Sequence, residues 1–259
     1  MSPGPPPRQP LWAVIPAYDE ERSIGATLTA LAAQSDTGFT LVVVDNASTD
    51  GTAAVVRRFA ATAPFPVHVV DEAEPGPGAA ADTGFRFAVA HGAALLVRTD
   101  ADCLPAPDWI ATARAEFARG AEMVCGRSVP RRDESPSFAE RHLLPALVRL
   151  TSLYGRYRGA HRHPRYRAPY VLCHGHNLAI TADLYVRCGG APRLPLRDSS
   201  DDVELLNRAR EHSHRIVRSE RLVVRASLRR LRAWGARRTL LWYWDRRYLP
   251  ADDREVHVR

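Results

Sequence analysis

Two aspartates stand one residue apart in the stretch RTDADC, directly after an apolar run. The run covers Ala93–Val97, and the aspartates are Asp100 and Asp102. In an extended backbone these two side chains share a side, and their like charges repel unless a cation or a donor lies between them. Oxygen ligands of this kind suit Mg²⁺ or Mn²⁺, so the pair indicates a metal site. An acidic loop in which Asp100 acts as a cap is the simpler alternative.

Acidic groups also follow the other apolar runs of the first half. Pro16–Glu20, Asp45 and Asp71 follow the first, second and third runs. In open α/β sheets, ligands bind beyond the carboxyl ends of the strands, so these groups are expected to collect around a ligand. Asp45 can accept a hydrogen bond from a base or a sugar hydroxyl. Taken alone, Pro16–Glu20 is explained more simply as a turn followed by a helix start.

Small residues in the stretch EPGPGAAADTG allow a close approach between backbone and ligand. Gly76, Gly78 and Gly84 stand among alanines at an expected helix start, and a helix N-terminus suits phosphate. The spacing matches neither the phosphate loop of nucleotide triphosphatases nor the dinucleotide fingerprint. Close helix packing is therefore the competing interpretation.

Two clusters in the second half carry groups for catalysis or metal binding. Cys173, His174 and His176 have no fourth ligand at a suitable spacing, so the sequence does not favour a zinc site. Asp201 and Asp202 stand at an expected helix start. They can simply interact with the helix dipole, or one of them can act as a general base.

A basic stretch near the C-terminus can bind phosphate. Arg229, Arg230 and Arg232 can clamp a diphosphate, although a solvated helix face is the simpler interpretation for most of them. Docking onto the domain, rather than onto a membrane or another subunit, is expected of the aromatic residues here, which are Trp234, Trp242, Tyr243 and Trp244.

The elements that position these groups follow from the periodicity of residues 11–125. Short apolar runs alternate with segments of helical spacing, which indicates β/α units around a largely parallel sheet. The runs are Leu11–Ile15, Leu41–Val44, Val67–Val70, Ala93–Val97 and Met123–Cys125. The later sequence predicts helices over about Phe138–Leu153, over Ala182–Cys188 and from near Asp201.

Length and composition favour one soluble domain. The chain has 259 residues and no long Ser-rich or Gly-rich linker. Residues 1–10 are too rich in proline to pack and carry no secretory signal pattern, so a disordered tail is expected there. The most apolar stretch, Phe85–Val97, contains Arg86 and His91 and is too short to span a bilayer. We therefore expect no transmembrane segment and a cytoplasmic protein.

The net charge of +7 comes entirely from arginine, because the chain contains no lysine. This pattern indicates a compositional bias, and no motif of a known nucleic-acid-binding module appears. A small molecule that carries phosphate fits the charge, and nucleic acid is not expected as a partner. Four cysteines without a CxxC pair predict reduced, structural thiols.

Seven stretches, in this order, resemble the family-two inverting glycosyltransferases of GT-A fold over about residues 11–240. They are VIPAYDEERSIGATL, VVDNASTDGT, GPGAAADTG, RTDADCLPAPDW, GHNLAI, CGGAP and SDDVELLNRAR. The resemblance implies a single α/β domain of GT-A fold, with a mixed, mostly parallel sheet flanked by helices and a helical C-terminal extension. It also implies a nucleotide-diphosphate sugar donor, with a UDP-sugar favoured, and Mn²⁺ or Mg²⁺ as cofactor. Hexosyl or N-acetylhexosaminyl transfer with inversion is the reaction it implies.

The resemblance implies roles for residues of the donor side. Base and ribose would be held by a set that also includes a glycine at the helix start: Pro16, Tyr18, Glu20, Asp45, Gly78 and Asp82. Asp100 would reach the ribose or the metal, and Asp102 would ligate the metal. Arg229 or Arg230 would lie near the diphosphate.

The resemblance places the remaining roles in the second half. Asp202, the second member of an acidic pair, would be the catalytic base. Asp201, His176 and Asn177 would lie on the acceptor side, together with the insertion from about residue 130 to 169.

The chain departs from the pattern in two places. It has Asp45 and Asn46 where the family often shows two aspartates, and Ala80, Ala81 and Asp82 where the family often shows Ala-Arg-Asn. The missing arginine affects the choice of base or the grip on the donor.

Four regions are predicted: a tail over 1–10, a donor half over 11–128, an acceptor half with the base over 129–225, and a basic, Trp-containing helical segment over 226–259. A soluble small-molecule acceptor of specialised metabolism is favoured. A lipid-linked acceptor, met by a protein peripheral to the membrane, is the alternative, and we allow for a homodimer.

Two other classes of protein fit the sequence less well. A nucleotidyltransferase needs a Gly-rich loop with a basic residue after the first strand, where this chain reads PAYDEE. A non-catalytic nucleotide-sugar binding protein has no need for both Asp102 and Asp202.

Overall fold

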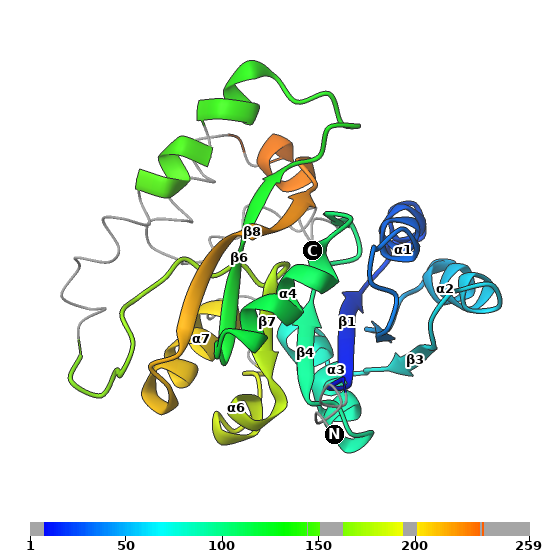
Figure 1. Cartoon of the computed structure of the whole chain (residues 1–259). Helices are drawn as coiled ribbons and strands as arrows, with labels where there is room; N and C mark the ends of the chain where they lie inside the picture. The colour runs from blue at the N-terminus through cyan, green and yellow to red at the C-terminus, as the bar shows by residue number, and fades with distance from the viewer. Residues whose placement is uncertain (1–7, 144, 151–162, 194–200, 234, 236–259) are drawn as a thin grey trace, which may run out of the picture.

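A single mixed sheet of eight strands forms the centre of the molecule (Figure 1). The computed structural model describes residues 8–143, 145–150, 163–193, 201–233 and 235. The strands are β1 (Leu11–Ala17), β2 (Thr40–Asp45), β3 (Val67–Asp71), β4 (Leu95–Arg98), β5 (Leu104–Pro105), β6 (Met123–Pro130), β7 (Leu178–Thr181) and β8 (Ile216–Ala226). They are arranged in the order β3-β2-β1-β4-β7-β6-β8-β5.

Helices cover both faces of the sheet. They are α1 (Ile24–Ala32), α2 (Thr52–Ala60), α3 (Pro77–Ala90), α4 (Trp109–Ala118), the π-helix η1 (Ala139–Leu143), α6 (Ala182–Arg187) and α7 (Asp201–His212). Residues of α1, α2 and α4 share one buried apolar cluster, and residues of α3, α6 and α7 share the other. The fold is therefore the helix-flanked α/β architecture that the sequence predicts.

Strand β1 explains why the first half reads as unbroken apolar runs. All seven of its residues are buried. Leu11, Ala13 and Ile15 belong to one apolar cluster, whereas Trp12 and Val14 belong to the other. A strand covered on both faces has no polar side, so its sequence lacks the apolar–polar alternation of a half-exposed strand.

The strands predicted over residues 11–125 run largely parallel, as expected, and a strand of the second half makes the sheet mixed. The first four strands pair in parallel, but β7 lies between β4 and β6 and runs antiparallel to both. Strand β6 is parallel to β8, with which it pairs as far as Pro130. The strands β5, β7 and β8 were not predicted, because β5 and β7 are very short and β8 alternates with many charged residues.

Several predicted segments coincide only in part with the structure. The expected helix over 138–153 is the π-helix η1 followed by helical residues 145–150, and its last three residues lie outside the described part. Residues 8–10 of the expected tail are placed, since Arg8 forms an ion pair with Asp36 and Gln9 accepts a hydrogen bond from Arg114. The other tail residues and the C-terminal tryptophans lie outside the described residues.

The four cysteines are buried and unpaired, as the sequence predicts. Within the described ranges, no helix combines the length and the apolarity needed to cross a bilayer.

Gly84 makes the close packing of α3 on the sheet possible. A Cβ atom at this position would lie 2.4 Å from Cγ1 of Val14 and 2.9 Å from Cγ2 of Val44. We expect Gly84→Ala to lower the free energy of unfolding by about 1–3 kcal/mol, which is the usual cost of overpacking. Urea denaturation followed by circular dichroism measures the change.

Gly25→Ala is the matched control. A Cβ on Gly25 in α1 has no neighbour within 4 Å. Because alanine favours the helix more than glycine does, this variant should be as stable as the wild type or more stable by up to about 1 kcal/mol. Equal destabilisation of the two variants would contradict the packing argument.

Candidate active site

The carboxyl ends of β1, β2 and β4 meet at one edge of the sheet. Ala17 at the end of β1 is in register with Asp45 at the end of β2. Thr99, which follows β4, donates its N–H to the carbonyl of Val14 at 3.2 Å. The acidic groups that follow these strands are therefore neighbours, as expected for the ligand-binding edge of an α/β sheet.

Asp100 and Asp102 lie in a turn, and not in the extended backbone that the sequence suggested. The N–H of Cys103 donates to the carbonyl of Asp100 at 3.1 Å. Each carboxylate has its own cation, because Nε of Arg98 lies 3.4 Å from Asp100 and Nη2 of Arg229 lies 3.0 Å from Asp102. Two separate guanidinium groups thus offset the repulsion between the two aspartates.

Arg229 connects the turn after β1 with the turn after β4. It donates to both carboxylate oxygens of Glu20, at 3.2 and 2.5 Å, in addition to Asp102. Burial raises the pKa of Glu20, and the Arg229 guanidinium offsets only part of that effect. The backbone N–H of Glu20 also donates to Thr52 at 2.8 Å. These contacts hold Glu20 against the sheet edge.

A cavity of about 300 Å³ borders the contact between Arg229 and Asp102. It is lined by Arg22, Ser23, Asp102, Arg131, Glu134, Ser227, Arg229 and Arg232. The lining therefore carries more guanidinium groups than carboxylates. Guanidinium groups bind phosphate oxygens through paired N–H donors, so the cavity suits a phosphate group.

Arg98 is a site residue that sequence reasoning missed. It is buried and donates to Asp201 at 2.6 Å while it also contacts Asp100. Burial alone would lower the pKa of Arg98, but Asp201 and Asp100 outweigh it and raise the pKa, so the group stays charged. A charged residue at the end of the apolar run LLVR was the available signal. Its partner stands 103 residues away.

Asp202 is held in a defined orientation at the start of α7. One carboxylate oxygen accepts the N–H of Gly175 at 3.0 Å, and the other accepts the N–H of Val203 at 2.8 Å. Arg98, the partner of Asp201, also lies beside this loop, because its side chain would be 3.3 Å from a Cβ on Gly175. Asp201 and Asp202 therefore both approach the loop that contains Gly175. The predicted base and the β4 turn are thus joined through Arg98.

The two predicted acceptor residues of the GHN stretch have different environments. His176 bonds Ser128 through Nε2 at 2.9 Å, and burial lowers its pKa, which favours the neutral ring. Asn177 is 0% exposed, and its amide bonds Trp109, the carbonyl of Arg127 and the carbonyl of Leu222. The structure therefore does not bring Asn177 to a surface that an acceptor can reach.

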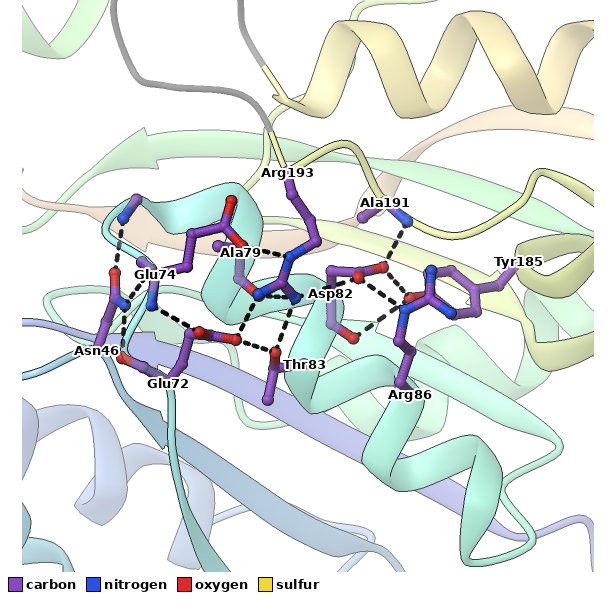
Figure 2. Close-up of polar contacts among 11 residues, drawn as sticks. Asn46, Glu72, Glu74, Ala79, Asp82, Thr83, Arg86, Tyr185, Ala191 and Arg193 are labelled. Carbon is purple, nitrogen blue, oxygen red and sulfur yellow. Dashed lines mark hydrogen bonds and ion pairs between the residues drawn. The ribbon is translucent and has the colours of Figure 1, made fainter.

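Asp82 is enclosed and does not lie open at the sheet edge. It is 0% exposed and accepts hydrogen bonds from the Tyr185 hydroxyl at 2.5 Å, from Arg86 at 2.7 Å and from the N–H of Ala191 at 2.9 Å. Figure 2 shows these groups converging on the carboxylate. A direct contact between Asp82 and a base is therefore not available in this structure.

Gly78 lies where α3 meets a neighbouring segment. A Cβ on Gly78 would stand 2.6 Å from the carbonyl oxygen of Pro192 and 3.1 Å from Cβ of Asp201. Close packing, rather than open space for a ligand, surrounds this glycine.

Asn46 and Arg193 were not predicted as site residues, and both tie the loops of the donor side together (Figure 2). The Asn46 amide donates to the carbonyls of Glu72 and Glu74 and accepts the N–H of Gly76. Arg193 donates to the carboxylates of Glu72 and Glu74 at 2.7 Å each. An aspartate at position 46 could not donate to the two carbonyls, which gives a physical reason for this departure from the family pattern.

The remaining predicted donor residues lie along the same edge. Pro16 is in register with Val44 inside the sheet, and Tyr18 follows in the next turn. The Asp45 carboxylate accepts the N–H of Ser48 at 3.1 Å. Arg230 follows Arg229 in the helical turn after β8.

Asp102 is the described side chain best placed to hold a divalent cation. Its carboxylate is 22% exposed and borders the cavity. Across the described ranges, no three His, Cys, Asp or Glu side chains are grouped closely enough to hold a metal ion by themselves. A single carboxylate such as Asp102 fits Mg²⁺ or Mn²⁺, which proteins usually bind through one or two carboxylates together with substrate phosphates.

The chain is similar to known glycosyltransferases in sequence and in fold. The model of glycosyl transferase family 2 matches residues 12–181. A mannosyltransferase from Pyrobaculum calidifontis, solved in complex with GDP-Man and Mn²⁺, has a TM-score of 0.60 and 26% identity over 85% of this chain and 57% of its own. TarS from Staphylococcus aureus, solved in complex with UDP-GlcNAc, has a TM-score of 0.58 at 16% identity over 85% of this chain and 58% of its own, which shows the fold alone.

Two curated relatives match a shorter part of the chain. An uncharacterised glycosyltransferase of Mycobacterium tuberculosis is 37% identical over 117 residues, which are 45% of this chain and 48% of that protein. The polyprenol monophosphomannose synthase of Mycolicibacterium smegmatis is 31% identical over 126 residues, which are 48% of this chain and 47% of that protein. The matches thus span about half the length of these relatives.

The Glu72 carboxylate makes stability depend on acid pH. Burial raises the pKa of Glu72, but hydrogen bonds from Thr83 and from the N–H of Glu74, together with Arg193, outweigh burial and lower the pKa to about 2. A carboxyl with a lowered pKa stabilises the fold above its unfolded pKa, here 4.5, and this contribution is lost as the pH falls through the folded value.

We therefore expect the wild type to lose more unfolding free energy than Glu72→Gln between about pH 4.5 and pH 2. Urea denaturation at a series of pH values measures both curves. Parallel curves for the two proteins would show that the Glu72 contacts do not stabilise the folded state.

Proposed function

Because the chain belongs to glycosyl transferase family 2, we propose that it transfers a sugar from a nucleoside diphosphate donor to an acceptor hydroxyl or amine, with inversion at the anomeric carbon. The observation that carries the proposal is the contact of Arg229 with both Glu20 and Asp102 beside the cavity. This contact unites the residues expected to bind nucleotide, metal and diphosphate.

A UDP-sugar is the first donor to test, and GDP-mannose is the second. The sequence resemblance favours UDP, whereas the mannosyltransferase with 26% identity was solved with GDP-Man. In our proposal Pro16, Tyr18 and Asp45 hold the base and ribose, because they stand at or just beyond the ends of β1 and β2. Glu20 acts beside them by orienting Arg229, and Asp100 faces the ribose.

Asp102 is the proposed metal ligand, and Mn²⁺ or Mg²⁺ the proposed cofactor. A bound divalent cation supplies Lewis-acid stabilisation of the charge that develops on a departing diphosphate. Arg229 and Arg230 add positive charge for the same diphosphate, and the cavity beside Arg229 suits its oxygens.

Asp202 is the proposed general base. Its two backbone hydrogen bonds fix the direction of the carboxylate at the start of α7. An acceptor hydroxyl is a poor nucleophile, so a positioned base that takes its proton during attack accelerates transfer on the order of 10² to 10⁴ times. Asp201, held by Arg98, and His176, held by Ser128, lie in the same half and are proposed to face the acceptor.

A soluble small molecule and a lipid-linked molecule are the two acceptor classes to compare. The sequence favours the first. The relative named polyprenol monophosphomannose synthase supports the second. A homodimer stays a prediction.

Donor binding is testable through thermal stability. We expect one of UDP-glucose, UDP-GlcNAc, UDP-galactose or GDP-mannose, with Mn²⁺, to raise the melting temperature more than the nucleotide sugar or Mn²⁺ alone. A ligand at about 100 times its Kd stabilises a fold by about 2.7 kcal/mol. Asp102→Asn should remove the part of the gain that requires Mn²⁺.

Asp108→Asn is the matched control for Asp102→Asn. Asp108 is exposed at the start of α4 in the same loop region and makes no side-chain cap bond. It should keep the full gain with Mn²⁺ and donor. An equal Mn²⁺-dependent gain in Asp102→Asn and the wild type would remove Asp102 from the metal site.

The base is testable by Asp202→Asn. Because the amide cannot accept the acceptor proton, we expect kcat to fall about 10²- to 10⁴-fold while the Kd of the donor changes little. Glu204→Gln, in the same turn of α7 and paired with Arg208, should keep near-normal turnover. Near-normal kcat in Asp202→Asn would assign the base to another residue.

A further inference from the structure

Arg193 connects the segment after α6 with the β3–α3 connection and with the helix α3. Its Nη2 and Nε atoms lie 2.7 Å from carboxylate oxygens of Glu72 and Glu74, and its Nη1 atom lies 3.4 Å from Asp82. Nη1 also donates to the Thr83 hydroxyl at 3.0 Å. Figure 2 shows the guanidinium between the β3–α3 connection and the helix α3. One side chain thus holds three acids from two elements.

Asp82 of α3 also holds the backbone of the same segment. It accepts the N–H of Ala191, two residues before Arg193, at 2.9 Å. The preceding residue Gly190 has a φ of +91°, and a Cβ there would lie 2.7 Å from the Asp82 carboxylate. Backbone and side chain of the segment 190–193 are therefore both bound to α3.

The first turn of α3 also contacts the start of α7. The space at Gly78 is limited on one side by Pro192 and on the other by Asp201. The segment 190–193 and the start of α7 thus both pack on the N-terminal half of α3. From Asp201 the contacts continue through Arg98 to Asp100 at the end of β4.

We propose that Arg193 is a positioning residue for sugar transfer: by binding Glu72, Glu74 and Asp82 together, it holds the segment 190–193 on α3, beside the start of α7, and so sets the place of Asp201 and Asp202. The inference rests on the proposed function, in which Asp202 removes the acceptor proton. Arg193 touches neither substrate in this mechanism. It acts through the first turn of α3, on which Pro192 and Asp201 both pack.

The contacts explain why Arg193 should influence turnover more than donor affinity. The loops near Asp45 keep their own hydrogen bonds, because Asn46 binds the carbonyls of Glu72 and Glu74 and the N–H of Gly76 independently of Arg193. When Arg193 is replaced, the first two residues of the segment 190–193 keep their bonds, because the N–H of Ala191 donates to Asp82, the N–H of Gly190 donates to the carbonyl of Tyr185, and Arg208 donates to the carbonyl of Gly190. Residue 193 itself loses its contacts with Glu72, Glu74 and Asp82. A shift of about 1 Å in a catalytic group can lower a rate about 10²-fold.

Arg193→Gln tests the proposal. We expect kcat to fall at least tenfold, while the donor Kd with Mn²⁺ and the donor KM change less than threefold. Amide hydrogen exchange in the first turn of α7, at Val203 to Leu205, should become at least fivefold faster in the variant without any ligand. Arg193→Lys should recover only part of kcat, because its single nitrogen cannot replace the three separate guanidinium nitrogens that face Glu72, Glu74 and Asp82.

Arg187→Gln is the matched structural control. Arg187 has a similar exposure, 36% against 33% for Arg193, and it also binds two acids, Glu122 and Asp183. Its third contact is the carbonyl of His212 at the opposite end of α7 from Asp202. We expect this variant to lose comparable thermal stability and to keep kcat and the exchange rate at Val203 to Leu205.

Two outcomes would overturn the proposal. One is a kcat within twofold of the wild type in Arg193→Gln, and the other is an equal loss of kcat in Arg187→Gln. Failure of the proposed function has a different signature, namely no transfer by the wild type with any donor and acceptor. The exchange measurement needs no activity, so unchanged exchange at α7 in Arg193→Gln refutes the positioning role in that case as well.

Discussion

Neutralisation of clustered acids by arginines from distant parts of the chain is the constraint on which this structure depends. Glu20 and Asp82 are both buried, and each is paired with an arginine. A buried carboxylate without partners costs several kcal/mol. Arg98 and Arg229 each contact acids of at least two elements, so the same contacts that make burial tolerable also fix the loops relative to one another.

Ion pairs of this kind connect the two predicted halves of the chain. Arg98 belongs to β4 in the first half, and its shortest contact is with Asp201 in the second. Strand β7, which comes from the second half, lies directly beside β4. Packed strands and an ion pair therefore join the residues expected to bind the nucleotide to the start of α7, and the boundary expected near residue 128 does not interrupt the sheet.

The apolar runs of the sequence predicted the strands of the first half, because burial of a strand depends on its own residues. Strands β1, β2 and β4 are mostly buried apolar runs, whereas the edge strand β3 is only partly buried. The ends of all four were found because acidic residues follow them. Contacts across the chain could not be read in this way, since Arg193 and Glu72 are 121 residues apart. Asn177 was misplaced for the same reason: its motif resembles a site, but its amide is occupied by Trp109 and two strands. Asp82 stands where the family often shows asparagine, and this departure was visible in the sequence. In the structure its carboxylate is buried and bonded to Tyr185 and Arg86.

The exclusive use of arginine has a consequence for alkaline conditions. Lysine ammonium groups lose their protons near pH 10.4, whereas guanidinium groups stay charged above about pH 12. The chain has no lysine, and the ion pairs around Glu20, Asp82 and Asp201 are all made by arginine. These ion pairs should therefore persist at an alkaline pH at which ion pairs made by lysine would be lost.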